Sequence, residues 1–225
     1  MSLCLGGRSG EVFLLKVGLT GGIASGKSVV GEMFVALGAH LVQADEIAHQ
    51  LMQPGQVVYQ EVIRHFGAGI VDPDGKINRA RLAEAAFGAT GGRPSRIQEL
   101  NQIVHPAVIQ RQEEWMEGVG HREPQAIAVV EAALIVEAGA AERFDRLVVV
   151  TCRPGQRIQR WAQRVKVDEE TARKEVMRRM AAQLQDEEKI RGADYVIDNS
   201  GARDETAKQV RAVFEKLRQE AQERL

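Results

Sequence analysis

Cysteine and long apolar runs are scarce in this 225-residue chain, and each scarcity excludes a class of protein. The two cysteines, Cys4 and Cys152, are too few for a disulfide framework, and this usage fits a reducing cytoplasm. No apolar run approaches the ~18 residues that cross a membrane. Residues 1–12 are glycine-rich and lack the pattern of a signal peptide. We expect them to be a disordered tail or a cloning remnant.

An excess of either charge is also absent. Thirty basic and 31 acidic residues give a net charge of −1, whereas a nucleic-acid-binding protein would usually be more basic. We therefore expect small-molecule partners rather than nucleic acid or a membrane, and the composition leaves the oligomeric state open. Residues 153–180 differ, with nine basic against four acidic residues. This segment is either a solvated helical face or an anion-binding surface.

Short apolar segments indicate an α/β fold. Five of them read as strands, at residues 13–20, 40–44, 126–131, 147–151 and 195–198. Most are continuously apolar rather than alternating, which is typical of parallel strands buried on both faces. Helical patterns lie between them, at 28–37, at 168–183 with Asp168 as N-cap, and at 200–225. Alternation of strand and helix predicts a parallel sheet with right-handed crossovers.

One long segment between the second and third strands breaks this alternation. About 80 residues there contain no strand candidate, although a simple crossover needs far fewer. Helical stretches are expected at 57–66, 79–87 and 94–117, and Pro106 should kink the last one or start a new helix. We interpret residues 57–122 as a helical insertion and residues 13–56 and 123–225 as the core.

The most specific motif follows the first strand. It reads Gly21-Gly22-Ile23-Ala24-Ser25-Gly26-Lys27-Ser28 and fits the phosphate-loop pattern, with Val29 continuing into the next helix. Glycines allow the backbone amides of such a loop to approach phosphate oxygens, at the positive end of a helix. Lys27 can place a charge on the terminal phosphates, and the Ser28 hydroxyl suits Mg²⁺. The alternative is a glycine-rich turn capped by a serine.

A phosphate loop alone does not define a function. A GTPase should carry an Asn-Lys-x-Asp motif, and the sequence contains none. A motor ATPase usually needs a longer chain. The remaining class is a small-molecule kinase with a helical substrate insertion and a lid.

Several stretches, in this order, resemble the dephospho-coenzyme A kinase family. The similarity covers about residues 15–201. The matching stretches are Gly18 to Ser28, Ala44-Asp45-Glu46-Ile47-Ala48, Pro54-Gly55, Phe66-Gly67, Arg79 with Leu82, Leu100-Asn101 leading to His105-Pro106, Arg160 with Arg164, and Ala193 to Asn199 with Gly201.

The resemblance implies an ATP-dependent kinase that phosphorylates the ribose 3′-hydroxyl of dephospho-CoA in the cytoplasm. It implies a P-loop kinase fold, in which a five-stranded parallel sheet carries helices on both faces. The insertion would bind the acceptor, and a basic lid at about 153–183 would close over ATP with Mg²⁺. Two alternatives remain open at this point. One is a nucleoside or nucleotide kinase of the same architecture, and the other is a nucleotide-binding regulator without turnover.

The sequence departs from the family pattern in two places. The family usually has Asp-Ala-Asp after the second strand, and here Gln43 replaces the first acid while Asp45 is kept. The family also tends to have an acid followed by Pro-Leu-Leu-x-Glu after the third strand. Here Glu131 and Glu137 are kept and the proline is lost. Glu131 is therefore a further candidate for the Mg²⁺ site beside Ser28.

The resemblance and the residue chemistry together assign roles. Asp45 would orient and deprotonate the acceptor hydroxyl, and the alternative is a helix N-cap. Arg160 and Arg164, four residues apart, would share a helix face and act with Lys27 on the transferring phosphoryl group. Their alternative is a solvated face. Arg178 or Arg179 would assist them, and the sequence does not select between the two.

The remaining candidates have weaker signals. Arg79 and His105 would contact the acceptor, against surface charge for Arg79 and a structural role for His105. The resemblance places Asn199 and Gly201 near the adenine of ATP, and the alternative is a simple turn.

Overall fold

The computed structural model describes residues 14–87 and 95–223. The chain divides into two compact units. One contains the residues up to Leu41 together with those from Met116 onward, and the other contains Val42–Trp115.

Two expectations from the sequence concern the domain organisation. The tail expected at 1–12 lies outside the described residues. The insertion expected at 57–122 overlaps the second unit, and its role in acceptor binding stays a prediction.

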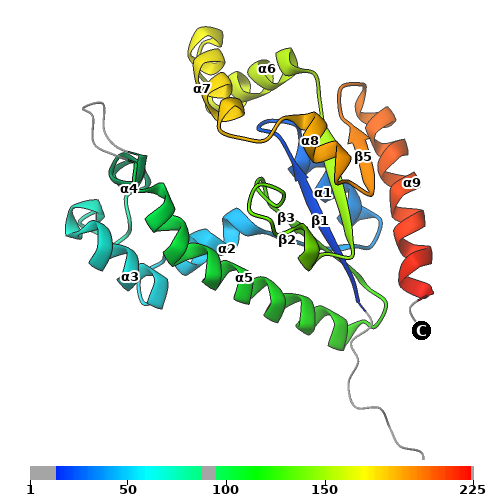
Figure 1. Ribbon diagram of the computed structural model, residues 1–225, viewed down its shortest axis with the longest axis horizontal. Helices are drawn as coiled ribbons and strands as arrows, with labels where there is room; N and C mark the ends of the chain where they lie inside the picture. The colour runs from blue at the N-terminus through cyan, green and yellow to red at the C-terminus, as the bar shows by residue number, and fades with distance from the viewer. Residues whose placement is uncertain (1–13, 88–94, 224–225) are drawn as a thin grey trace, which may run out of the picture. The chain divides into compact units, whose positions relative to one another are not determined.

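The first unit is built on the sheet (Figure 1). The strands of the sheet are β1 (Leu15–Gly21), β2 (His40–Gln43), β3 (Ile127–Glu131), β4 (Arg146–Thr151) and β5 (Tyr195–Asp198), and the division between the two units falls within β2. Their spatial order is β2-β3-β1-β4-β5. Strand β1 pairs in parallel with β3 and β4, and β4 pairs in parallel with β5. The expected five-stranded parallel sheet is confirmed.

Helices cover both faces because the strands are apolar on both. Leu15, Val17 and Leu19 of β1 pack in one buried cluster with residues of α1 (Lys27–Ala36) and α9 (Arg203–Gln222). Leu147 and Val149 of β4 belong to another cluster, which includes Ile135 and the partly buried Ala141 of a short 3₁₀ turn, η2 (Ala141–Arg143). Burial of these side chains is the main source of stability for the sheet.

Parallel pairing brings the carboxyl ends of the strands to one edge. In the register, Leu19 lies beside Glu131 and Thr151 lies beside Asp198. Ligands of open α/β sheets bind at this edge. The phosphate loop, Glu131 and the loop after β5 therefore meet there.

Three helices occupy the basic segment and the residues after it. They are α6 (Pro154–Val165), α7 (Glu169–Ala181) and α8 (Asp186–Arg191). Helix α6 is followed by its C-cap residue Lys166, which adopts a left-handed conformation with φ 59°. Asp168 caps α7, because its carboxylate accepts from the Thr171 N–H at 2.9 Å. The N-cap expected at Asp168 is confirmed.

The second unit is helical. It contains α2 (Ala44–Leu51), α3 (Val57–Phe66), a 3₁₀ turn η1 (Ala68–Ile70), α4 (Arg79–Phe87) and the first part of α5 (Ile97–Arg122). Its core joins Ile47, Val62, Leu82 and Val104, one from each helix. The expected helices at 57–66 and 79–87 are confirmed.

Of the two outcomes expected at Pro106, a kink or a new helix, the new helix does not form, because α5 continues through this residue. Val104 and Val108 on either side are buried in the core of the unit, which holds the helical path. Pro106 and Gln102, whose carbonyl loses its usual helical donor, are both exposed. Water can hydrogen-bond that carbonyl, so the proline is tolerated inside the helix.

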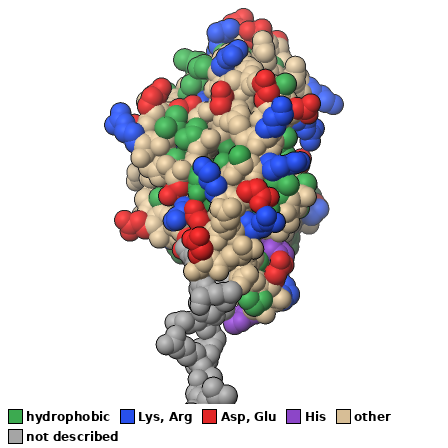
Figure 2. Space-filling view, turned by 90° about the vertical axis from the view of Figure 1, so that its right-hand side faces the viewer, with side chains coloured by type: hydrophobic (Ala, Val, Ile, Leu, Met, Phe, Trp, Pro, Cys, Tyr) green, Lys and Arg blue, Asp and Glu red, His purple; other side chains and the backbone are tan. Residues whose placement is uncertain are grey.

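The surface carries no extended single-sign field on the face in Figure 2, where acidic and basic side chains are interspersed. Among the helices of residues 14–87 and 95–223, none has both the length and the apolar character needed to span a membrane.

Candidate active site

The phosphate loop has the backbone that the motif predicts. Strand β1 ends at Gly21, and α1 begins at Lys27. Gly26, directly before the helix, has φ 95°, a conformation that side chains with a Cβ rarely adopt. A Cβ at this position would also overlap the amide nitrogen of Asn199. Gly26 is therefore required both by its backbone angle and by its neighbour.

Lys27 lies folded over its own loop. Its Nζ donates to the carbonyl oxygens of Gly21 at 3.0 Å and of Gly22 at 3.3 Å. The loop thus holds the ammonium group close to the backbone that would surround a polyphosphate. An incoming phosphate would offer this lysine a stronger, charged acceptor.

Ser28 and Glu131 form a pair of oxygen groups at the strand edge. The Ser28 hydroxyl donates to Glu131 Oε1 at 2.8 Å, and the Glu131 side chain is buried at the end of β3. A hydroxyl beside a carboxylate is a hard-oxygen set of the type that Mg²⁺ prefers. The two residues proposed from sequence as metal ligands are therefore in contact.

A cavity of about 520 Å³ opens beside the loop. It collects most of the sequence-predicted nucleotide residues. They are Ala24, Gly26, Lys27, Ser28, Val29, Arg160, Arg164, Asn199 and Gly201. Arg203 also lines the cavity and was not predicted from the sequence. Its position at the start of α9, two residues after Gly201, was the available signal.

The other residues of the phosphate-loop motif do not line this cavity. Gly21 is the last residue of β1, and Gly22 packs against the guanidinium of Arg157. Ser25 is fully buried. Ile23 is buried in a cluster with Ile158 and Trp161 of α6 and with residues of α7.

The arginines of α6 are held in different ways. Arg160 donates to the Ser25 carbonyl at 3.2 Å and to the Asn199 carbonyl at 2.8 Å. The Arg164 guanidinium lies 4.7 Å from the centre of the Trp161 ring, which is a cation–π contact. These contacts position both side chains at the wall of the cavity. A plain solvated face therefore does not describe Arg160, which binds the loop itself.

Arg178 and Arg179 of α7 differ in their contact with the Trp161 ring. Both arginines form an ion pair with Glu175, and the Arg179 guanidinium also lies 4.5 Å from the centre of the Trp161 ring. Hydrogen bonds from Arg178 and then Arg179 lower the pKa of Glu175 to about 2. Of the two residues, Arg179 shares the Trp161 ring with Arg164.

Arg157 is the second residue that the sequence analysis did not select. Its side chain is 3% exposed, forms an ion pair with Asp186 and packs on Gly22. Burial raises the pKa of the neighbouring Cys152 thiol, so this cysteine stays protonated. The spacing of Arg157, Arg160 and Arg164 was a usable signal, because it places all three near one helix face.

The acceptor candidates belong to the second unit, and each is exposed there. Asp45 lies in the first turn of α2, whose N-cap is Gln43. The N-cap alternative for Asp45 is therefore wrong. Arg79 is the first residue of α4, and His105 lies on α5.

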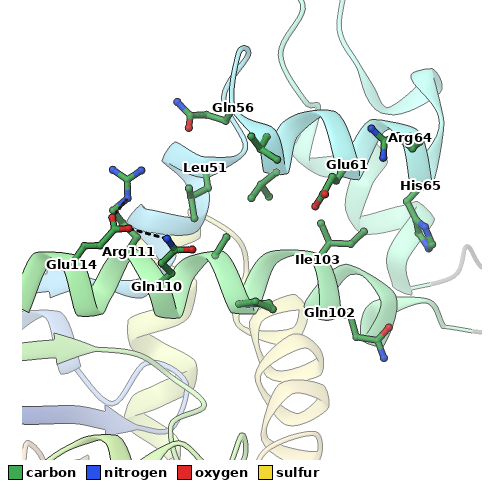
Figure 3. Close-up of a pocket in the computed structure, with 14 residues that line it drawn as sticks. Leu51, Gln56, Glu61, Arg64, His65, Gln102, Ile103, Gln110, Arg111 and Glu114 are labelled. Atoms are coloured by element: carbon green, nitrogen blue, oxygen red, sulfur yellow. Dashed lines mark hydrogen bonds and ion pairs between the residues drawn. The ribbon is translucent and has the colours of Figure 1, made fainter.

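None of these three acceptor candidates lines the cavity of about 780 Å³ that this unit encloses between α3 and α5 (Figure 3). Leu51, Val58 and Ile103 contribute apolar surface to that cavity, and Glu61 and Arg64 contribute charge.

The comparisons with known proteins agree with this geometry. The family model described as dephospho-CoA kinase matches residues 15–205. The dephospho-CoA kinase of Aquifex aeolicus is 37% identical over 202 residues, which cover 90% of this chain and 97% of the relative. That of Syntrophotalea carbinolica is 38% identical over 204 residues, covering 91% and 92%.

A crystal structure of a Thermus thermophilus protein superposes with a TM-score of 0.74 at 27% identity, covering 90% of this chain and 97% of that one. The family model spans most of the sequence, and the relatives match over nearly their whole length. This chain belongs to the dephospho-CoA kinase family.

Proposed function

We propose that the protein transfers the γ-phosphoryl group of ATP to the ribose 3′-hydroxyl of dephospho-CoA, giving CoA and ADP. The observation that carries the proposal is the match of residues 15–205 to one kinase family, because it spans both the phosphate loop and the helical unit. This reaction is the last step of CoA biosynthesis. We expect the enzyme to act in the cytoplasm, where its co-substrate ATP is supplied.

The donor side rests on fixed positive groups. The amides of the phosphate loop and the N-terminus of α1 would surround the β- and γ-phosphates. Lys27 would leave the carbonyls of Gly21 and Gly22 for phosphate oxygens, and Arg164 would add charge from the lid. Such preorganised charges act where negative charge spreads in the transition state, and they need little rearrangement.

The Ser28 hydroxyl and the Glu131 carboxylate fit a magnesium ion by their chemistry and their contact. When bound, Mg²⁺ would neutralise phosphate charge. The role of Ser28 and Glu131 is to hold that ion at the strand edge, next to Lys27.

On the acceptor side, Asp45 would accept the proton of the ribose 3′-hydroxyl. The 3′-oxygen would then form a bond to the γ-phosphorus of ATP, and the bond between the γ-phosphorus and the β–γ bridging oxygen would break. The Asp45 side chain is exposed, and a positioned carboxylate is a common general base. Arg79 and His105 would contact the acceptor in the same unit. The exposure of all three leaves them accessible to a substrate.

The test is an ADP-release assay with ATP and Mg²⁺ against dephospho-CoA, adenosine, AMP, CMP and pantetheine. The proposal expects strong turnover with dephospho-CoA alone. Strong turnover with AMP or CMP and none with dephospho-CoA would select a nucleotide kinase instead. ATP binding without turnover on any acceptor would select a regulator.

A further inference from the structure

Asn199 is buried at the wall of the nucleotide cavity, and both polar ends of its side chain are used within the protein. Its Nδ2 donates to the Ser25 carbonyl at 2.8 Å, and its Oδ1 accepts from the Thr206 hydroxyl at 3.0 Å. The side chain is 8% exposed, and Thr206 is fully buried. A buried amide with both ends satisfied is held in one orientation.

The Ser25 carbonyl and the Thr206 hydroxyl together hold that amide in the orientation that meets the loop. Its hydroxyl donates to Asn199 and lies in the first turn of α9. If the amide were flipped, its oxygen would face the Ser25 carbonyl oxygen and its nitrogen would face the hydroxyl. The first contact would be repulsive. The Ser25 carbonyl therefore selects the orientation in which Nδ2 binds the loop, and the Thr206 hydroxyl strengthens that orientation by donating to Oδ1.

The Ser25 carbonyl is consequently pinned from two sides. It accepts from Asn199 Nδ2 and from Arg160 Nη1 at 3.2 Å. In a trans peptide the carbonyl and the following N–H point in opposite directions. Holding the Ser25 carbonyl toward Asn199 and Arg160 thus directs the Gly26 N–H the other way.

This constraint matters because Gly26 lines the nucleotide cavity. Glycine allows the 25–26 peptide to rotate more freely than other residues would. An unpinned loop would spend part of its time with this N–H turned away from the cavity. Phosphate binding would then have to restore its direction at the expense of affinity.

We propose that Asn199 and Thr206 are positioning residues, which orient the Gly26 amide for phosphate and do not read the adenine base. The proposal rests on the function proposed above, and it extends that function to two residues behind the loop. It replaces the adenine contact that the family resemblance suggests for Asn199. The part of the ligand whose binding depends on Asn199 and Thr206 is the polyphosphate chain.

The experiment compares Asn199→Ala, Thr206→Val and Thr206→Ser with the wild type. Calorimetry would measure the Kd of a non-hydrolysable ATP analogue, of the matching GTP analogue and of inorganic tripolyphosphate, which has no base. Thr206→Ser is the matched control, because it keeps the hydroxyl. Melting temperatures check that each variant is folded, and Thr206→Val carries the test if Asn199→Ala does not fold.

We expect Asn199→Ala to weaken all three ligands by about tenfold, and Thr206→Val to weaken them by about threefold, as one or two loop-holding hydrogen bonds are lost. The ratio of ATP to GTP affinity should not change, and Thr206→Ser should bind like the wild type. A changed ratio with unchanged tripolyphosphate binding would overturn the proposal. So would normal affinity in both Asn199→Ala and Thr206→Val. Because binding is measured without an acceptor, failure on dephospho-CoA would not affect this result.

Discussion

The charged side chain of Lys27 is positioned by its own loop. Its ammonium group is held by the Gly21 and Gly22 carbonyls, so it lies near the phosphate position before ATP arrives. We expect Lys27→Ala to lower kcat by ~10² or more, because a positioned charge contributes several kcal/mol at such a transition state. Lys208→Ala, an exposed lysine on α9, is the control and should keep wild-type kcat. Wild-type kcat in Lys27→Ala would refute the phosphate-loop assignment.

Asp45 makes a second test at the scale of one residue. Asp45→Asn should lower kcat by ~10²–10⁴ if the carboxylate takes the acceptor proton, since the amide cannot act as a base. ATP affinity should change little. Glu46→Gln is a matched control, because Glu46 is also an exposed acid in the first turn of α2. Both variants lose the same favourable interaction with the helix dipole. Equal kcat values in the two variants would show that Asp45 has no catalytic role.

Single residues also show what the sequence can predict. The phosphate loop could be predicted from the sequence, because its glycines, lysine and serine are each required by local geometry. Asn199 was selected for a different role, because its partners Ser25 and Thr206 are 174 and 7 residues away and only the fold brings them together. The spacing of Arg157 from Arg160 and Arg164 predicts a shared helix face, but the burial of Arg157 was not predictable, because charge patterns do not distinguish an exposed arginine from a buried one. Its burial depends on Asp186 and Gly22, which lie in other elements.

At the scale of elements, α8 is fixed to the loop after β3 by a buried ion pair. Lys189 has no exposed surface, and its Nζ lies 2.7 Å from Glu137 Oε1. The same oxygen accepts from the Leu184 N–H at 3.2 Å, ahead of α8. Glu137→Gln should lower the free energy of unfolding by about 3 kcal/mol, because it leaves a buried charge without its partner. Denaturant unfolding measures this change.

The control for this pair is the exposed pair of Lys174 and Glu170, four residues apart on α7. Glu170→Gln should cost well under ~1 kcal/mol, as exposed ion pairs usually do. Equal losses of stability in Glu137→Gln and Glu170→Gln would mean that the buried pair does not brace α8.

Helix α7 carries a pH dependence that follows from Glu175. Arg178 and Arg179 lower the pKa of Glu175 to about 2, below its usual value of 4.5. A carboxylate with a lowered pKa stabilises the fold above its unfolded pKa, and this contribution is lost as the pH falls toward 2. The melting temperature of Glu175→Gln should therefore lie below that of the wild type at pH 7, and the gap should close toward pH 2.5. A constant gap across this range would contradict the assignment.

The elements themselves were largely predictable, and the exceptions have physical reasons. Helices at 57–66 and 79–87 follow from apolar spacing and from their turn residues. The uninterrupted course of α5 was not predictable from Pro106 alone. It depends on burial of Val104 and Val108, which is a property of the assembled unit rather than of the local sequence.

For the molecule as a whole, the phosphate loop contacts the basic segment at about 153–183 that the sequence predicts to be a lid. An isolated excess of positive charge would favour a mobile lid before ATP binds. The structure instead buries Ile23 of the loop with Trp161 of α6 and Val176 of α7. The Ile23 N–H also donates to the Gln183 side chain, just after α7, at 3.1 Å. The phosphate loop and helices α6 and α7 are therefore packed together through Ile23.

This packing predicts a specific response in hydrogen exchange measured along the chain. An ATP analogue with Mg²⁺ should slow exchange in residues 153–181 more than in the sheet strands, because bound phosphate neutralises the lid and stabilises the loop beneath it. Ile23→Ala should weaken this protection, since it removes most of the apolar contact while leaving the loop amides in place. Arg164→Lys keeps the charge but loses the planar fork, so kcat should still fall. If nucleotide leaves exchange in 153–181 unchanged and Arg164→Lys retains wild-type kcat, this segment is a solvated surface and not a lid.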